Sequence, residues 1–130
     1  MRGVKPRSEW VEKGDGFLRG ARRAMEEGLY WLAYFNAHQA AELYLKGLLA
    51  SMTGVHPYTH DLAELLEALR ATGVEPPSDD VVLSSELLTP HYTLARYPGK
   101  RVYTYTAERG RMCIDGAEKI VEWVKKVADP

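Results

Sequence analysis

Apolar and small residues recur three or four positions apart along most of the chain, which is the spacing of one helix face and not of a β-strand. The first such stretch begins near Ser8 and runs to about Glu27. Gly28 follows it, and a glycine at that place ends a helix in the left-handed conformation without steric cost. The apolar or small positions of this predicted helix are Trp10, Gly14, Phe17, Ala21, Ala24 and Met25. Because glycine weakens a helix, we expect close packing of a neighbouring helix at Gly14, Gly16 and Gly20.

A second helix is predicted from Leu29 to about Met52, and it has two distinct faces. One is a stripe of small and apolar residues suited to a core: Ala33, Ala37, Ala40, Ala41, Tyr44 and Leu48. The other combines aromatic rings with hydrogen-bonding groups: Trp31, Phe35, His38, Gln39, Glu42 and Lys46. A face turned to water would not need large aromatic side chains, so we expect this face to be covered by a second subunit or a ligand. The alternative is that another helix of the same chain covers it.

The third predicted helix follows a loop around Gly54 and Pro57, with Thr59 or Asp61 as its N-cap. Its apolar positions have the i, i+3, i+4, i+7 pattern of one helix face: Leu62, Leu65, Leu66 and Leu69. Its end is marked by Gly73, Pro76 and Pro77.

A fourth helix is predicted after Ser78 or Asp79, and it weakens or ends at Pro90. Its expected inward positions are Val82, Leu83, Glu86 and Leu87. Residues 91–105 are expected to be irregular, and a fifth helix begins at Thr106. The core positions of that helix are Cys113, Ala117, Ile120, Val121, Val124 and Val127. With no confident strand, the predicted fold class is an all-α bundle of mostly antiparallel neighbours.

Length and composition fit one globular domain covering 1–130, since the chain has 130 residues, 45% of them hydrophobic and 27% charged. The longest apolar run, Leu29 to Phe35, is far shorter than the ~20 residues that span a bilayer, so no membrane helix is expected. The N-terminal residues lack the apolar stretch of a secretory signal. A single cysteine, Cys113, forms no internal disulfide, and we therefore expect a cytoplasmic protein.

Charge is unevenly distributed, although the net charge is only −1. Residues 1–23 sum to +4, residues 24–90 to −8 and residues 91–130 to +3. The two basic ends can form a surface for an anionic partner. Alternatively, the acidic middle and the basic ends attract one another within the fold.

Metal and nucleophilic chemistry find little support in the sequence. The histidines are His38, His56, His60 and His91, and no Glu-x-x-His pair of a di-iron bundle exists. Cys113 falls on an apolar helix face, where a buried thiol is inert. We therefore expect neither a metal site nor a catalytic residue. His60 precedes Asp61 at a helix start, where local packing or hydrogen bonding is its simplest role.

The stretch His91 to Arg101 interleaves tyrosines with basic residues. Aromatic rings and guanidinium groups are what nucleic-acid bases and phosphates use for stacking and bidentate contact. The residues concerned are Tyr92, Arg96, Tyr97, Lys100, Arg101 and Tyr103. A nucleotide or single-stranded RNA could bind here. The alternative is a structural corner, in which Arg96 pairs with an acidic residue such as Glu42 or Glu86.

Three ordered motifs together resemble a HEPN domain, the "higher eukaryotes and prokaryotes nucleotide-binding" family. The first is Gly28-Leu29-Tyr30 leading into the alanine-rich stretch that contains His38-Gln39-Ala40-Ala41-Glu42 and Leu45-Lys46. The second is Thr59-His60-Asp61-Leu62 with Leu65-Leu66, and the third is Tyr92 with Arg96-Tyr97-Pro98. The resemblance covers nearly the whole chain. It implies an up-and-down bundle of four long helices plus a shorter one, usually homodimeric.

Many members of that family are ribonucleases with an arginine followed after four to six residues by a histidine, and this sequence lacks such a pair. The resemblance therefore implies a stand-alone, non-catalytic member that binds a nucleotide such as ATP, or RNA, as the accessory subunit of a minimal nucleotidyltransferase in a toxin–antitoxin-like pair. The alternatives are a metal-independent endoribonuclease using Arg96 and His91, and a purely structural dimerisation module.

Site residues follow from matching these motifs position by position. The resemblance implies ligand-contacting roles for Lys46, His60, Arg96 and Tyr97, with Glu42 orienting Lys46 from one helical turn away. The expected homodimer interface consists of Trp31, Phe35, His38, Gln39 and Glu42.

Overall fold

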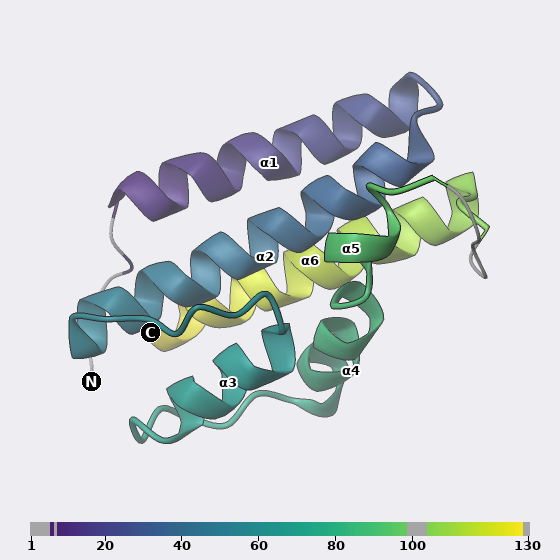
Figure 1. The fold of residues 1–130 in the computed structure, drawn as a ribbon. Coiled ribbons are helices and arrows are strands. Elements are labelled where there is room, and N and C mark those ends of the chain that lie inside the picture. Colours follow the sequence, from purple (N-terminus) through teal and green to yellow (C-terminus); the bar gives the residue numbers. More distant parts are fainter. Residues whose placement is uncertain (1–5, 7, 99–103, 129–130) are drawn as a thin grey trace.

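The computed structural model describes residues 6, 8–98 and 104–128, and its regular elements there are all helices (Figure 1). They are α1 (Ser8–Glu26), α2 (Tyr30–Thr53), α3 (Leu62–Arg70), α4 (Asp79–Leu88), α5 (His91–Leu94) and α6 (Ala107–Ala128). The all-α class is confirmed. Within the described residues α1, α2 and α6 are long, whereas α3 and α4 are short and α5 is a four-residue helix inside the stretch expected to be irregular.

The long helices lie side by side with α2 in contact with both others (Figure 1). A tight turn reverses the chain between α1 and α2, which run in opposite directions. In that turn Gly28 has φ +76°, and the N–H of Leu29 donates to the carbonyl of Ala24 at 2.9 Å. This left-handed cap is the one expected at Gly28. The segments between α2 and α6 return the chain to the starting end of α2, so α6 runs in the same direction as α2.

Close helix packing accounts for two of the three glycines in α1. A Cβ on Gly14 would lie 2.8 Å from the Tyr44 ring, and one on Gly20 would lie 3.2 Å from Asn36. A Cβ on Gly16 would meet nothing within 4 Å, so the expected close contact is absent there.

The core is built on the small-residue stripe of α2, which is buried at every expected position. Its residues are Ala33, Ala37, Ala40, Ala41, Tyr44 and Leu48. From α6 the expected core positions are also buried, except Val127, which is partly exposed: Cys113, Ala117, Ile120, Val121 and Val124. Both helical periodicities are therefore confirmed.

The predicted inward face of α4 is wrong by about one position. The buried residues are Val81, Ser84, Ser85 and Leu88, while Leu83 is 60% exposed. The two serines can be buried because their hydroxyls donate to carbonyls of their own helix, at 2.7 and 2.6 Å. Gly116 of α6 faces Ser84, and these two small residues let α4 lie close against α6. A pattern read only from apolar residues therefore selects the wrong face.

The connection before α3 places His60 next to a helix start. Asp61 is the N-cap of α3, and its carboxylate accepts from the N–H groups of Ala63 and Glu64. Two of the first unpaired N–H groups of the helix are satisfied in this way. None of the helices in the described part of the chain is long and apolar enough to cross a membrane.

Candidate functional site

Three polar side chains stand one helical turn apart on α2, and two of them bond to His60 in the connection to α3. They are His38, Glu42 and Lys46. Glu42 Oε2 accepts from Lys46 Nζ at 3.0 Å, and the two side chains are only 6% and 7% exposed. The i, i+4 spacing makes this pair possible, and the expected contact between Glu42 and Lys46 is confirmed.

The second oxygen of the same carboxylate reaches His60. Glu42 Oε1 lies 2.9 Å from Nδ1 of the His60 ring. A carboxylate oxygen accepts hydrogen bonds, so Nδ1–H of the ring is the donor. In a neutral ring the other nitrogen, Nε2, then keeps its lone pair. The His60 side chain is 46% exposed, and no other hydrogen bond of this ring is found among the described residues.

The backbone of His60 is held by a second histidine of α2. His38 Nε2 donates to the carbonyl oxygen of His60 at 2.7 Å, and His38 Nδ1 lies 3.0 Å from the side-chain oxygen Oε1 of Gln39. His38 is completely buried, and this burial lowers its pKa below the ordinary value of 6.5. A neutral His38 and the Glu42 carboxylate thus hold His60 at two points, the carbonyl and the ring.

The exposed part of His60 belongs to an aromatic and cationic cluster. Its ring stacks on Tyr92 with centroids 3.5 Å apart and an interplanar angle of 12°. The guanidinium carbon of Arg96 lies 4.2 Å from the centre of the same Tyr92 ring. Two groups so close to one ring centre cannot share a face, so they take opposite faces of Tyr92. Arg96 also lies over Phe35 at 5.4 Å and over Tyr97 at 5.2 Å.

Arg96 is exposed and donates from Nε to the carbonyl of Tyr92 at 2.6 Å. The anticipated ion pair with Glu42 or Glu86 is not formed, because Glu42 already bonds Lys46 and His60. Within the described part of the chain no carboxylate pairs with this guanidinium. We call His60, Tyr92, Arg96 and Tyr97 the aromatic–cationic corner. A guanidinium stacked on rings and open to solvent can bind an anion, and the adjacent rings can stack on a base.

Comparison with known proteins identifies the family of the chain. Residues 8–127 match the HEPN domain family. The chain belongs to the HEPN family. Its structure is similar to that of TT1696 from Thermus thermophilus, with 32% identity, a TM-score of 0.81 and coverage of 91% of this chain and 94% of that one. None of the curated proteins matches the chain significantly.

Two further solved structures are similar to this HEPN domain. ST0689, described as an archaeal HEPN homologue, has 30% identity and a TM-score of 0.71, and the match covers 91% of this chain and 93% of that one. A HEPN domain protein from Thermotoga maritima has 18% identity and a TM-score of 0.57, with 92% and 90% covered, which supports the fold alone.

Three of the four expected ligand residues of this HEPN domain come together. His60, Arg96 and Tyr97 share the corner, and Tyr97 is 60% exposed. Lys46 is buried in its pair with Glu42, so it is not placed to touch a ligand and instead fixes the carboxylate that orients His60. The basic residues expected to follow Tyr97, namely Lys100 and Arg101, lie outside the described residues, as does Tyr103.

The structure buries some residues of the expected dimer face and leaves others exposed. His38 and Glu42 are 0% and 4% exposed in the single chain, so the fold itself buries them and a partner has little left to contact. Trp31 is 43% exposed, whereas Phe35 and Gln39 are partly buried. An interface through the exposed part of this face stays a prediction.

The link between Glu42 and His60, and the stacking of His60 on Tyr92, were missed by sequence reasoning. Glu42 and His60 are 18 positions apart and His60 and Tyr92 are 32 positions apart, so no local sequence pattern predicts these contacts. The available signal was the His38, Glu42, Lys46 series at i, i+4, i+8, which marks a polar line on an otherwise buried helix.

His91 does not join the corner. It is completely buried, and its ring contacts Tyr34 edge-on at 4.8 Å and Tyr105 at 5.7 Å. Burial lowers its pKa from 6.5 to about 4, so it is neutral near pH 7. A ribonuclease site that uses His91 together with Arg96 would need this side chain to leave the core.

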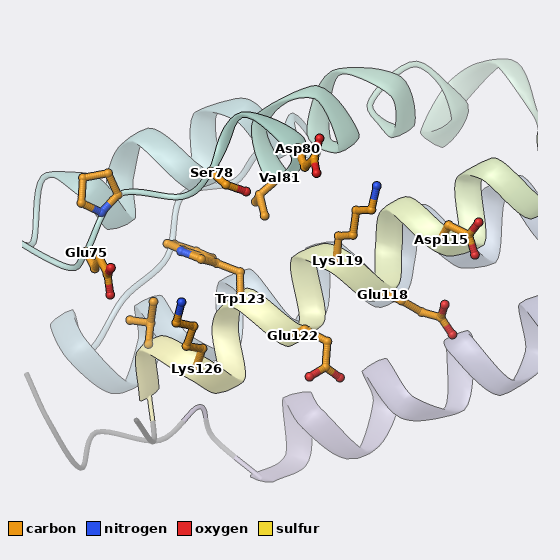
Figure 2. Close-up of a pocket in the computed structure, with 12 residues that line it drawn as sticks. Glu75, Ser78, Asp80, Val81, Asp115, Glu118, Lys119, Glu122, Trp123 and Lys126 are labelled. Atoms are coloured by element: carbon orange, nitrogen blue, oxygen red, sulfur yellow. The ribbon is translucent and has the colours of Figure 1, made fainter.

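A separate open groove of about 650 Å³ lies between α6 and the segment that leads into α4 (Figure 2). Trp123 points from α6 toward the segment that contains Ser78, Lys119 points from α6 toward α4, and Trp123 is almost fully buried. The groove shares no residue with the aromatic–cationic corner. Its rim mixes carboxylates with two lysines, which gives no single charge for a ligand to match.

Proposed function

We propose that this protein is a non-catalytic HEPN-domain subunit that binds a nucleotide or single-stranded RNA at the aromatic–cationic corner. The observation that carries the proposal is the exposed Arg96 guanidinium, which is stacked on Tyr92 and has no carboxylate partner among the described residues. An arginine held in this way offers its terminal N–H groups to a phosphate, and it loses little side-chain freedom on binding because the rings already hold it.

The surrounding rings support a nucleotide in preference to a bare anion. Tyr97 is 60% exposed next to the guanidinium and gives a base a surface to stack on. The missing arginine–histidine pair and the burial of His91 support binding without cleavage.

Titration of the purified protein with ATP and with a short single-stranded RNA tests the proposal. Arg96→Ala should weaken binding about tenfold and reduce the salt dependence of the affinity, because one phosphate contact is lost. Arg70→Ala is the matched control, since Arg70 is an exposed arginine on α3 away from the corner and should leave binding unchanged. If neither ligand binds the native protein, the proposal is wrong.

The partner in this proposal is a minimal nucleotidyltransferase, in a toxin–antitoxin-like pair. Family membership supports this assignment. The proposal predicts that a neighbouring reading frame encodes a minimal nucleotidyltransferase, and co-expression of that protein with this chain, followed by size-exclusion chromatography, should yield one complex. Separate elution of the two proteins at micromolar concentration would remove the partner from the proposal.

A homodimer through the exposed part of the α2 face is also proposed. Trp31 and Phe35 are four residues apart on one side of α2, and a large ring that is 43% exposed favours a contact with a second copy. Sedimentation should give a dimer for the native protein and a monomer for Trp31→Glu. A native protein that sediments as a monomer at high concentration would contradict the dimer.

A further inference from the structure

The exposed edge of the His60 ring carries Nε2, and the buried side chains behind the ring determine whether this atom donates or accepts. A role of Nε2 in ligand recognition rests on the proposed function. Glu42 accepts a hydrogen bond from Nδ1–H at 2.9 Å, so a neutral ring presents Nε2 as an acceptor and not as a donor. Lys46 donates to the other oxygen of the same carboxylate at 3.0 Å, and His38 donates to the carbonyl of His60 at 2.7 Å. The buried network therefore sets the tautomer of a half-exposed ring.

An acceptor and a cation then stand on the two faces of one tyrosine. His60 and Arg96 both contact Tyr92, with ring centroids 3.5 Å apart and the guanidinium carbon 4.2 Å from the ring centre. Arg96 requires an anionic acceptor from the ligand, whereas Nε2 of His60 requires a donor. A ligand with a hydroxyl close to a phosphate satisfies both groups.

We propose that His60 is a specificity-determining residue that accepts a hydrogen bond from a ribose 2′-hydroxyl while Arg96 holds the neighbouring phosphate, so that the corner prefers ribonucleotides to deoxyribonucleotides. In an RNA strand the 2′-hydroxyl is adjacent to the 3′-phosphate, and this hydroxyl is the group that distinguishes RNA from DNA. Glu42 and Lys46 act as positioning residues, since they hold the tautomer and do not touch the ligand.

The other charged and polar groups near His60 are compatible with this role. Asp61 is engaged with the α3 N–H groups, and Thr59 donates to Glu64 at 2.7 Å. Neither of these side chains is among the partners of the His60 ring within the described residues. The His60 side chain is 46% exposed, and its Nε2 has no hydrogen-bond partner among the described residues.

The test compares adenosine 3′-monophosphate with 2′-deoxyadenosine 3′-monophosphate by calorimetric titration. The native protein should bind the ribose form about tenfold more tightly, which corresponds to one hydrogen bond at a partly exposed site. His60→Phe keeps a ring to stack on Tyr92 and removes the acceptor, so both nucleotides should bind with similar affinity. His56→Phe is the control, because the His56 ring packs on Trp10, outside the corner, and the preference should persist.

Glu42→Gln gives a readout that a merely structural role would not produce. Lys46 attracts the amide oxygen of the new side chain, so the amide nitrogen faces His60 and donates to Nδ1. The proton then moves to Nε2, and the acceptor becomes a donor. Because a hydroxyl both donates and accepts, the decisive readout is the tautomer. The nitrogen-15 shifts of the imidazole should report the Nδ1–H tautomer in the native protein and the Nε2–H tautomer in the variant, and phosphate binding should remain.

Three results would overturn the inference. Equal affinity of the native protein for the two nucleotides would refute ribose selection while leaving the proposed function intact. A preference that survives in His60→Phe would assign selection to another residue. If neither nucleotide binds, the proposed function and the inference fail together. Should Glu42→Gln not fold, the His60→Phe comparison and the tautomer of the native protein still decide the question.

Discussion

Lys46 and Glu42 form an ion pair 3.0 Å long on adjacent turns of α2, and both side chains are almost sealed from solvent. Removing one member of a buried pair leaves the other charge without compensation in a poorly solvated site. The pair is therefore a sensitive point for stability as well as for the orientation of His60.

Replacing the carboxylate should be strongly destabilising. We expect Glu42→Ala to lower the free energy of unfolding by about 3–5 kcal/mol, because the Lys46 ammonium is left buried and unpaired. Urea denaturation measures the change. The exposed pair of Arg70 and Glu67 is the control, and Glu67→Ala should cost less than about 1 kcal/mol. Similar losses in the two variants would mean that the Lys46 ammonium is solvated after all.

Two glycines of α1 should respond to alanine with opposite signs. In Gly14→Ala the new methyl group would lie 2.8 Å from the Tyr44 ring, so overpacking should destabilise the protein by about 1–3 kcal/mol. In Gly16→Ala the methyl group meets nothing within 4 Å, and the better helix propensity should stabilise the protein by up to about 1 kcal/mol. Thermal denaturation compares the two, and a loss of stability at both positions would contradict the packing shown for α1.

The N-caps of α3 and α4 differ in a way that a pair of variants can measure. Asp61 accepts from two backbone N–H groups of α3, so Asp61→Ala should cost about 1 kcal/mol. Ser78 occupies the equivalent position of α4 without a side-chain cap bond, so Ser78→Ala should be close to neutral. Both values come from urea denaturation at pH 7. Equal losses of stability in the two variants would show that the hydrogen bonds of the Asp61 cap do not account for the loss in Asp61→Ala.

Acid should destabilise the fold through His91. Burial holds its folded pKa at about 4, while the unfolded chain has the ordinary value of 6.5. The unfolded state therefore binds more protons between these values, so this contribution is fully present above pH 6.5 and is lost as the pH falls toward 4. It amounts to about 3 kcal/mol from the pKa difference.

His91→Phe tests this pH dependence because it keeps a ring against Tyr34 and Tyr105 and cannot be protonated. Unfolding free energies measured at pH 7 and pH 4.5 should differ less in the variant than in the native protein. His38 acts in the same direction, since burial lowers its pKa too, and it remains in both proteins. An unchanged pH dependence in His91→Phe would show that other groups cause the loss of stability at low pH.

Much of the fold follows from local patterns in the chain. The bounds of the long helices, the cap at Gly28, the cap at Asp61 and the small-residue stripe of α2 all depend on residues close together in sequence. Side-chain spacing at 3.6 residues per turn and the left-handed preference of glycine act within a few residues, so they can be read directly. The line of His38, Glu42 and Lys46 is visible for the same reason.

The α4 register shows where local reading stops. Ser84 and Ser85 are polar, yet they face the core because their hydroxyls bond within the helix and because Gly116 leaves room for Ser84. Gly116 lies on a different helix, more than 30 residues later in the chain. Only the packing of α4 on α6 decides which side of α4 is buried.

The sequence by itself determined the helical class, the core stripes, and the presence of a tyrosine-rich basic stretch around Arg96. The tertiary structure decided that His60, Tyr92 and Glu42 meet, that Lys46 is buried, and that Arg96 is left without a carboxylate partner in the described part of the chain. The physical reason is that these contacts join α2, the connection before α3, and α5. Their alignment depends on how the helices pack, and no spacing along the chain encodes it.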